Sequence, residues 1–353
     1  MFLAIKEIKR EKMRYGLIIL MIFLISYLIF VLSSLAVGLA SENTQAIVSW
    51  QAKQVVLNKN ANVSISQSVL NKADLKNAKM TNDEALLGQT PVVVKSKGRT
   101  QVSAQFIGIK KNQFIYQGLE IIIGRKANKS DEVVVDQAFK DKGYHLNDKL
   151  ELNGSKKKYR IVGFARNAKI NIAPIVYGTL PMWKTLRQGI PTMQASAIIS
   201  RRSNYYNDHG NNKTYPIKQF ITKLPGYTAQ NMTFQLMIGF LFIISLIIIA
   251  VFLYILTMQK MHNFAVMRAQ GIPSGTLVRA TISQSIILVI TGVFLGFLAM
   301  LLTAKLLPAA VPMSFTPTIM LSGIIGMLLM GVIGSLIPVR SILKVDPAKA
   351  IGE

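Results

Sequence analysis

The spacing of four long apolar stretches constrains the fold of this chain more than any other feature of its sequence. Residues Tyr15 to Ala40 contain no Asp, Glu, Lys, Arg or His, and neither do residues Phe234 to Met258. Residues 277–307 and 316–339 carry ionisable side chains only near their ends. Each stretch is long enough to cross a hydrocarbon core of about 30 Å as a helix. The pattern predicts a membrane protein with one span, a large polar region and then three more spans.

The first apolar stretch follows several basic residues, as the core of a signal peptide would. However, its uninterrupted length exceeds that of a signal-peptide core, and Gly38-Leu39-Ala40-Ser41 matches a cleavage site only weakly. We therefore expect this stretch to be retained as a transmembrane helix.

Basic residues on the short flanks predict the orientation of the spans. They precede the first span, lie between the second and third spans at Lys260 and Arg268, and follow the last span at Arg340 and Lys344. The connection between the last two spans, residues 308–315, carries no charge. Because cytoplasmic loops are enriched in Lys and Arg, both termini and the 259–276 loop are expected in the cytoplasm. Residues 42–231 are then extracytoplasmic, and the chain is expected to be a multi-pass membrane protein.

The polar region carries most of the positive charge. The chain has a net charge of +25, and the region from Ser41 to Met232 contains 29 Lys or Arg against 12 Asp or Glu, a net +17. A basic surface often binds nucleic acid, but the expected position outside the cytoplasm excludes that partner. Anionic lipid head groups or wall polymers are the expected neighbours. The alternative is a solvated surface that lysine keeps soluble.

The polar region is predicted to fold as a mixed α+β domain. Short β-branched runs bounded by turn residues predict its strands, and a short amphipathic helix is expected at 137–142. The predicted strands are 90–94, 102–109, 119–123, 132–136, 149–152 and 158–163. Residues 46–58 are expected to continue the first span and then enter a strand. The asparagine-rich segment 200–214 is predicted to be a mobile loop.

The spans contain small residues at the spacing that allows two helices to approach closely. Examples are Ser34 with Gly38 and Gly292 with Gly296, and the last span holds four glycines. Pro338 is expected to kink or end that span.

No pattern in the sequence supports an enzyme. A GxxxxGK[ST] phosphate-binding loop, HExxH and GxSxG are all missing, and the three histidines are scattered. These patterns also predict no metal site. The middle of each span also lacks Asp, Glu, Lys and Arg, so no proton or sodium relay is evident. Any energy for uphill transport would have to come from a partner protein.

The 259–276 loop contains the best candidate for such a contact. The segment from Met258 to Gly271 has a helical pattern that the run Gly271-Ile272-Pro273 ends. Met261, Phe264, Ala265 and Met267 can share an apolar surface for a cytoplasmic partner. The alternative is an interfacial helix that rests on lipid.

Several segments in the same order resemble the FtsX/MacB-type (type VII) ABC transporter permeases. Met267-Arg-Ala-Gln-Gly-Ile272 resembles their loop between the second and third spans, and Leu343-Lys-Val-Asp-Pro-Ala-Lys-Ala-Ile351 resembles their C-terminal tail. Residues 4–14 resemble their N-terminal amphipathic helix. Residues 132–136, 143–150 and 159–163 resemble their extracytoplasmic core. The fold expected from this resemblance is membrane α-helical, with four transmembrane helices in a 1+3 arrangement and an α+β extracytoplasmic domain inserted between helices 1 and 2.

Within that family, Gly38-Leu-Ala-Ser-Glu-Asn43 and Tyr254-Ile-Leu-Thr-Met-Gln-Lys260 are most similar to haem-exporter permeases. The resemblance implies a homodimer of permeases with two copies of a separate ABC ATPase, which binds the ATP. Haem is then the transported substrate, taken from the outer leaflet, and no intrinsic cofactor is expected. Two alternatives remain: export of another amphiphile or an antimicrobial peptide, or a non-transport role in which the outer domain activates an extracellular partner.

The resemblance also suggests site residues. The ATPase-coupling candidates lie on the 259–276 segment: Met261, Phe264, Met267, Arg268, Gly271 and Pro273. The haem-binding candidates lie where span 1 ends and span 2 begins, with one tyrosine inside span 1: Glu42, Asn43, Tyr27, Met232, Gln235 and Met237. Glu42 and Met237 are the candidate iron ligands. Alternatively, Glu42 faces water and the methionines face lipid.

These inferences divide the chain into nine segments. They are a cytoplasmic helix at 1–14, transmembrane helix 1 at 15–41, the outer domain at 42–231, transmembrane helix 2 at 232–258, the coupling helix and loop at 259–276, transmembrane helix 3 at 277–307, an outer loop at 308–315, transmembrane helix 4 at 316–343 and a cytoplasmic tail at 344–353.

Overall fold

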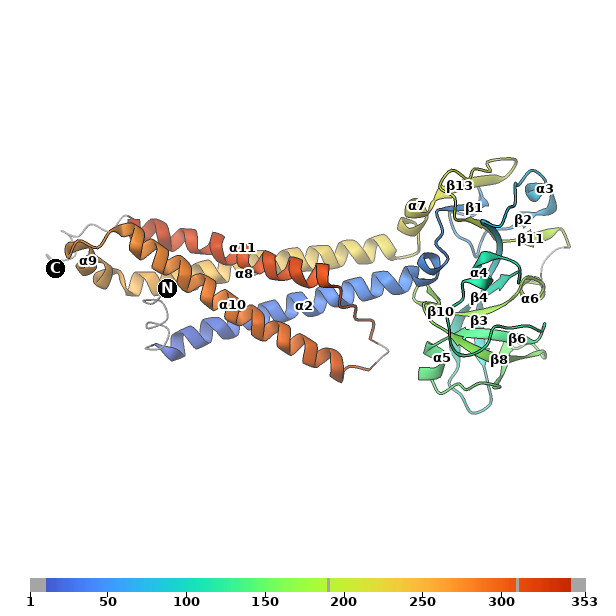
Figure 1. Cartoon of the computed structure of the whole chain (residues 1–353), viewed down its shortest axis with the longest axis horizontal. Coiled ribbons are helices and arrows are strands. Elements are labelled where there is room, and N and C mark those ends of the chain that lie inside the picture. Colours follow the sequence, from blue (N-terminus) through green and yellow to red (C-terminus); the bar gives the residue numbers. More distant parts are fainter. Residues whose placement is uncertain (1–10, 189–190, 309–310, 344–353) are drawn as a thin grey trace. The chain divides into compact units, whose positions relative to one another are not determined.

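The computed structural model describes residues 11–188, 191–308 and 311–343. The chain forms two compact units (Figure 1). One, here called the membrane unit, contains the residues up to Val37 and those from Met232 onward. The other, here called the inserted domain, spans Gly38–Asn231. The predicted N-terminal helix at 1–14, most of which lies at 1–10, and the predicted tail at 344–353 fall outside the described residues.

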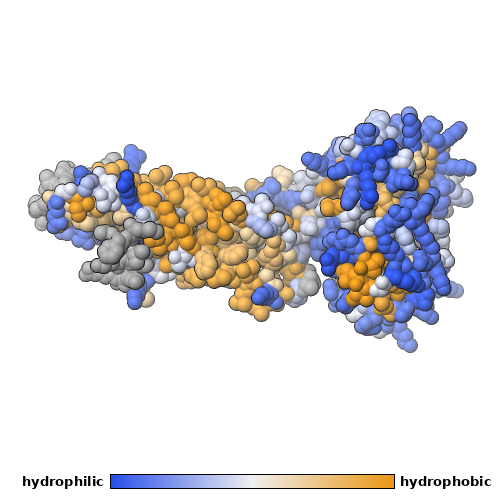
Figure 2. Space-filling view, viewed as in Figure 1, coloured by the Kyte–Doolittle hydropathy of each residue, from blue (hydrophilic) through white to orange (hydrophobic). Residues whose placement is uncertain are grey.

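The membrane unit is built from long helices. Four of them are long and apolar enough to cross a membrane, and they present a largely hydrophobic surface (Figure 2). The helices are α2 (Lys12–Ser49), α8 (Tyr227–Gln259), the short α9 (Met261–Ala269), α10 (Ser274–Leu306) and α11 (Pro317–Leu343). Helices α2 and α8 are longer than the spans predicted at 15–41 and 232–258, because each continues into the inserted domain as regular helix.

Small residues allow α2, α10 and α11 to pack closely. A Cβ atom on Gly292 of α10 would lie 2.6 Å from Ile22 Cγ2 of α2, so only glycine fits at this contact. Ser26 Oγ of α2 lies 3.3 Å from the Gly292 carbonyl oxygen, to which it donates. Two turns earlier along α10, Ser285 Oγ donates to the Gly331 carbonyl of α11 at 2.9 Å. Helix association in a membrane depends on this kind of close packing, since the hydrophobic effect does not favour one apolar neighbour over another.

Gly292→Val is predicted to weaken the α2–α10 contact. The added methyl groups would collide with Ile22, and such overpacking costs about 1–3 kcal/mol. Gly239→Val on α8 is the matched control, because no atom lies within 4 Å of a Cβ at that position. Resistance of the purified chain to unfolding by SDS, followed by circular dichroism, measures the difference. An equal loss of SDS resistance in Gly292→Val and Gly239→Val would contradict the close contact between α2 and α10.

The inserted domain contains a mixed sheet of eleven strands, which confirms the predicted α+β class. Its central order is β13-β1-β12-β3-β4-β10-β6-β8-β5; β7 pairs with β3 and β8, and β9 pairs with β10. The β4–β10 and β6–β8 pairs are parallel, and the other pairs are antiparallel. A separate pair joins β2 and β11. The strands are β1 (Gln54–Asn58), β2 (Leu70–Asn71), β3 (Glu84–Lys95), β4 (Val102–Ile109), β5 (Ile121–Gly124), β6 (Glu132–Asp136), β7 (Lys149–Leu152), β8 (Lys158–Ala165), β9 (Lys169–Ile170), β10 (Ala173–Thr179), β11 (Met193–Ala195), β12 (Ala197–Ser200) and β13 (Asn212–Pro216).

Alternating residues of the sheet fill two apolar cores, one on each face. In β10, Ile175 and Tyr177 enter the core that also contains Trp50 from the end of α2, whereas Val176 enters the core around Trp183. Gly88 and Gly108 are directly paired on β3 and β4, and a Cβ on either would collide with Trp183. The short helices around the sheet are α3 (Lys72–Leu75), α4 (Phe114–Gln117), α5 (Ala138–Asp141), α6 (Leu180–Leu186) and α7 (Ile217–Thr222).

The predicted loop at 200–214 contains no helix or strand from 201 to 211, but parts of it pack into the domain. Tyr205 and Asn207 are buried, and the last residues form part of β13. The backbone N–H of Asn207 donates to Thr214 Oγ1 at 2.9 Å, and Arg202 forms an ion pair with buried Glu84 at 2.8 Å. Some polar side chains of this loop, such as those of Arg202 and Thr214, thus serve as hydrogen-bond partners within the domain.

Buried Glu132 at the start of β6 accepts from two arginines. Its Oε1 lies 2.6 Å from Arg125 Nη2 and 3.0 Å from Arg160 Nη2. The hydrogen bond from Arg125 lowers the pKa of Glu132 well below its usual range, and the N–H groups of Asn128 and Lys129 act in the same direction against the effect of burial. A carboxyl group whose pKa is lower in the folded than in the unfolded state stabilises the fold when it is ionised.

Glu132→Gln is predicted to lower the unfolding free energy of the inserted domain by about 1–3 kcal/mol at neutral pH, since the arginines are partly exposed and therefore screened. The stabilisation is present above the unfolded pKa of about 4.3 and is lost as the pH falls below it, so the two proteins should converge in acid. Both tryptophans of the chain, Trp50 and Trp183, lie in this domain, so their fluorescence in a urea titration reports its unfolding. Glu151→Gln, at an exposed pair with Lys158, should have little effect. A difference in unfolding free energy that does not change with pH would refute the stabilising role of ionised Glu132.

Candidate functional site

Helix α9 is held against the rest of the membrane unit by its apolar side. Phe264 is only 7% exposed and packs in a cluster with Leu277 of α10 and Ile342 of α11, with Met267 at its edge. The Phe264 side chain is thus enclosed by its own chain, and its contact with an ATPase partner stays a prediction. Met261 is half-buried at the start of the helix.

The opposite side of α9 is exposed. It presents His262, Asn263, Val266, Ala269 and Gln270. These residues are three or four positions apart, so they form one face. The sequence pattern indicated the apolar face of α9 as the partner contact and did not single out this exposed face. The signal that identifies it is the polar identity of residues on the side away from Phe264.

A Schellman motif ends α9 and fixes where α10 begins. Gly271 has a positive φ of 89°, its N–H donates to Arg268 O at 3.0 Å, and the N–H of Ile272 donates to Met267 O at 3.1 Å. Met267 and Ile272 also pack in the same apolar cluster. Arg268 lies in the last turn, where a cation suits the helix dipole. Pro273 then precedes α10, so the turn between the two helices is rigid.

At the other candidate site, Glu42 is already paired. Its carboxylate contacts Lys169 Nζ of β9, and the two side chains are 13% and 17% exposed. Asn43 is 2% exposed. Its side-chain amide donates to Leu39 O at 3.0 Å, and its backbone carbonyl oxygen accepts from Asn171 N at 3.0 Å. The β9–β10 hairpin thus docks on the end of α2 that belongs to the inserted domain. Glu42 is not the free carboxylate that the sequence suggested.

Buried Asp136 binds backbone N–H groups next to that hairpin. Its oxygens accept from the N–H groups of Ala138 at 2.8 Å and Ala168 at 3.2 Å. Burial raises the pKa of Asp136, and these N–H donors together with Lys169 oppose the increase. Lys169 therefore faces two carboxyl groups, Glu42 and Asp136, and neutralises charge at the base of the hairpin.

The other haem candidates lie in the membrane unit. The hydroxyl group of Tyr27 is 3.0 Å from Thr303 Oγ1 of α10, so it takes part in helix packing. Met232, Gln235 and Met237 are exposed on α8. Met232 and Gln235 share a face, whereas Met237 is turned about 140° around the helix from Met232. The structure therefore places Glu42 beside Asn43, and it places Met232 on the same face of α8 as Gln235. Met237 lies on a different face of α8 from Met232.

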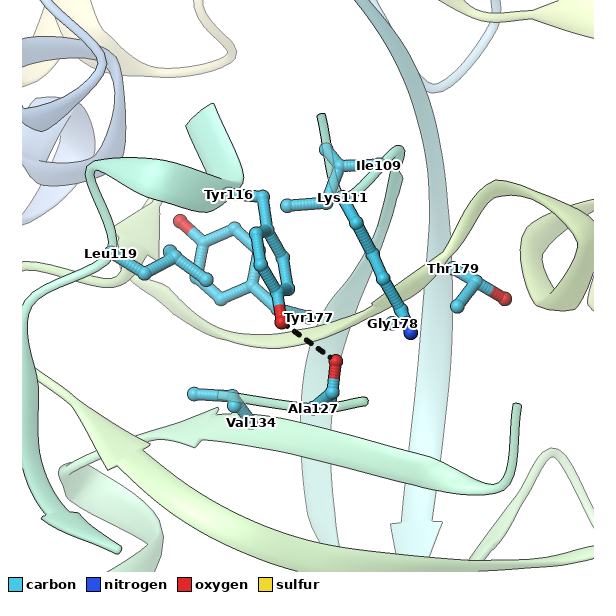
Figure 3. Close-up of a pocket in the computed structure, with 9 residues that line it drawn as sticks. All are labelled: Ile109, Lys111, Tyr116, Leu119, Ala127, Val134, Tyr177, Gly178 and Thr179. Atoms are coloured by element: carbon cyan, nitrogen blue, oxygen red, sulfur yellow. Dashed lines mark hydrogen bonds between the residues drawn. The ribbon is translucent and has the colours of Figure 1, made fainter. Parts of the chain in front are cut away.

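The closed cavity of the inserted domain is too small for a large cargo. Its volume is about 10 Å³, room for one water molecule, and Tyr116 and Tyr177 lie on its wall (Figure 3). Tyr116 donates to Ala127 O at 2.9 Å, as the dashed line in Figure 3 shows. Burial raises the pKa of Tyr177, whose oxygen accepts from Trp50 Nε1 at 3.2 Å. The hydroxyl groups of Tyr116 and Tyr177 therefore form hydrogen bonds within the domain.

Two wider hollows lie elsewhere. An apolar hollow of about 380 Å³ between α10 and α11 is lined by residues that include Phe297, Met300 and Phe315. An open groove of about 1090 Å³ in the inserted domain is lined by Lys72, Lys76 and Lys110 with several uncharged residues. In the described part of the chain, no three His, Cys, Asp or Glu side chains gather as ligands for a metal ion.

The sequence profile of the FtsX-like permease C-terminal domain matches residues 236–347, which contain α9 and most of the last three long helices. This part of the chain is an FtsX-like permease domain. The whole chain is 26% identical to "Putative hemin transport system permease protein HrtB" of Staphylococcus haemolyticus over 100% of this chain and 99% of that protein. It is 24% identical to the protein of the same name from Staphylococcus epidermidis strain RP62A, with the same coverage.

Among solved structures, the permease matches the periplasmic region of MacB from Actinobacillus actinomycetemcomitans. The identity is 14%, the match covers 48% of this chain and 92% of that chain, and the TM-score is 0.35. An ABC permease works with an ATPase subunit, and this one is a multi-pass membrane protein with an extracellular domain.

Val266→Asp is predicted to weaken binding of the ATPase subunit by about tenfold or more, since a charge placed in an apolar part of an interface loses its hydration. Val266 is exposed on α9 and contributes little to the fold, so the variant should remain folded. Tyr206→Asp, at an exposed site in the extracellular domain, is the control. Co-purification of the ATPase with each permease variant measures the effect. Wild-type recovery with Val266→Asp would show that this face of α9 is not the contact.

Proposed function

We propose that this permease is the membrane subunit of a bacterial ABC exporter that removes haem from the membrane by ATP-driven mechanotransmission. In this proposal two permeases pair with two ATPase subunits, and both termini lie in the cytoplasm. The observation that carries it is the alignment of the whole chain with permeases named for hemin transport. The basic residues beside the cytoplasmic ends of the spans support the orientation.

The distribution of charge favours an external source of energy. The centres of the spans contain no Asp, Glu, Lys or Arg with which to bind protons or sodium ions. The exposed face of α9 is available to an ATPase, and the Schellman motif at Gly271 holds α9 firmly on α10. Closure of the ATPases would then push on α9 and tilt the long helices.

Helix α2 is long enough to carry such a tilt out of the membrane. Its 38 residues correspond to about 57 Å, against about 30 Å for the hydrocarbon core. Its last turns belong to the extracellular domain, where Glu42 and Asn43 hold the β9–β10 hairpin. A tilt of α2 would therefore move this hairpin with it.

Haem needs an axial ligand to iron and apolar walls for the porphyrin. Glu42 can supply an oxygen ligand, but only if its carboxylate leaves Lys169. Met237 can supply sulfur, and it is exposed on α8 among other apolar side chains. Haem binding at Glu42 would thus compete with the ion pair, and the protein's affinity for haem should depend on both partners.

Titration of the purified complex with haem, followed by its absorbance, tests this site. Glu42→Ala should lower the affinity about tenfold or more, whereas Lys169→Met should raise it because Glu42 is released from its competing partner. Met237→Ala should also lower it if the thioether is a ligand. Glu151→Ala, an exposed carboxylate of the same domain, is the control. Unchanged affinity in Glu42→Ala and Met237→Ala removes both residues from the site.

The cargo itself is tested separately. A complex that binds no haem, together with unchanged growth on toxic haem when its gene is deleted, would refute haem export. Protection against an amphiphile or antimicrobial peptide would then favour another cargo. Recovery of an extracellular hydrolase with the permease would favour a non-transport role.

A further inference from the structure

We propose that the hydroxyl group of Tyr15 is the joint through which movement of α9 reaches α2 and α10. The inference rests on the proposed function in one respect, namely that α9 receives the force of the ATPase. It assigns Tyr15 as a positioning residue for the transport cycle.

Tyr15 is fully buried near the start of α2, and two donors converge on its oxygen. Lys260 Nζ donates to it at 2.6 Å, and Gln284 Nε2 of α10 donates to it as well. The Lys260 ammonium group also lies 5.3 Å from the centre of the Tyr15 ring, within the range of a cation–π interaction. One oxygen atom thus connects α2, α10 and the link between α8 and α9.

Lys260 stands at the break between α8 and α9. Helix α8 ends at Gln259, α9 begins at Met261, and Lys260 between them has φ −101° and ψ 3°. The preceding residue is also tied to α2, because Arg14 Nη1 donates to Gln259 Oε1 at 2.9 Å. A rotation of α9 about this break displaces the Lys260 side chain, and with it the group to which Tyr15 is bonded.

A polar joint transmits such a displacement better than apolar contacts do at this place. Apolar side chains slide past one another at little cost, whereas hydrogen bonds are directional and are stronger in surroundings of low dielectric constant. If the Tyr15 oxygen moved away, a buried amide and an ammonium group would lose an acceptor. Further along α2, the close contact at Gly292 holds α10 against it, so the two helices are expected to move together.

Tyr15→Phe in the full complex with its ATPase tests the joint, since it removes the oxygen and keeps the ring. The chain contains no cysteine, so a single spin label can be placed at Leu20→Cys on α2 or at Gln270→Cys on α9. In the wild type, trapping the ATPase with vanadate should change the spectra of both labels. In Tyr15→Phe, the α9 label should still respond and the α2 label should not, with ATP hydrolysis within about twofold and export reduced about tenfold or more.

Two variants separate this role from a general loss of packing. Tyr27→Phe removes a second tyrosine hydroxyl that α2 directs to α10, and it should keep both label responses. Lys260→Met should reproduce Tyr15→Phe, and the double variant should be no worse than either single one, because both remove the same interaction. A normal α2 response in Tyr15→Phe, or an equal loss in Tyr27→Phe, would overturn the proposal.

The label measurement needs no haem. A wild-type complex that exports no haem but shows the two label responses would therefore remove the proposed cargo and leave the joint in place.

Discussion

A backbone N–H or C=O group that enters hydrocarbon has to find its partner within its own segment, and this constraint underlies the rest of the permease. It makes the four apolar stretches regular helices. Polar side chains within them mostly follow the same rule. Ser26 donates to Ile22 O, Thr291 to Ile287 O and Thr303 to Ala299 O, each one turn back along its own helix. Helices whose polar groups are hydrogen-bonded internally pack according to the shape of their surfaces. The glycine at 292 therefore decides how closely α2 and α10 approach.

Because the span centres hold no Asp, Glu, Lys or Arg, the contacts of α2 with charged side chains lie near its ends. Tyr15 with Lys260 and Gln284 occupies one end of α2, and Glu42 with Lys169 lies near the other. Between them, α2 is held mainly by apolar packing. In the proposed mechanism, stiff helices with specific contacts at their ends would carry motion, since force applied at one end would not be dissipated by rearrangement of polar groups in the middle.

Acidic residues are scarce in the strongly basic extracellular domain, and several of them are buried at structural positions. Glu132 binds Arg125 and Arg160, Glu84 binds Arg202, and Asp136 holds the β9–β10 hairpin. Each carboxylate neutralises cations that would otherwise repel one another, so the domain combines a high net charge with a compact fold.

Much of the fold could be predicted from local patterns. The strands at 102–109, 132–136 and 149–152 coincide with the predicted ranges, since β-branched runs between turn residues need no distant information. The candidate site was less predictable. Phe264 lies on an apolar helix face, and that pattern is the same whether the face meets a partner or the helix's own chain. Likewise, nothing near Glu42 in the sequence indicates that Lys169 will be its partner.

The sequence by itself determined the number and order of the spans, the class of the inserted domain and the end of α9 at Gly271. Each of these depends on residues close together in the chain: apolar length, alternation, or a glycine that can adopt positive φ. Only the tertiary structure decided which face of α9 is exposed, that Glu42 and Asn43 are engaged by a hairpin, and that Tyr15 connects α2 and α10 with the link between α8 and α9. Those contacts bring together residues far apart in sequence, so they depend on how the elements pack.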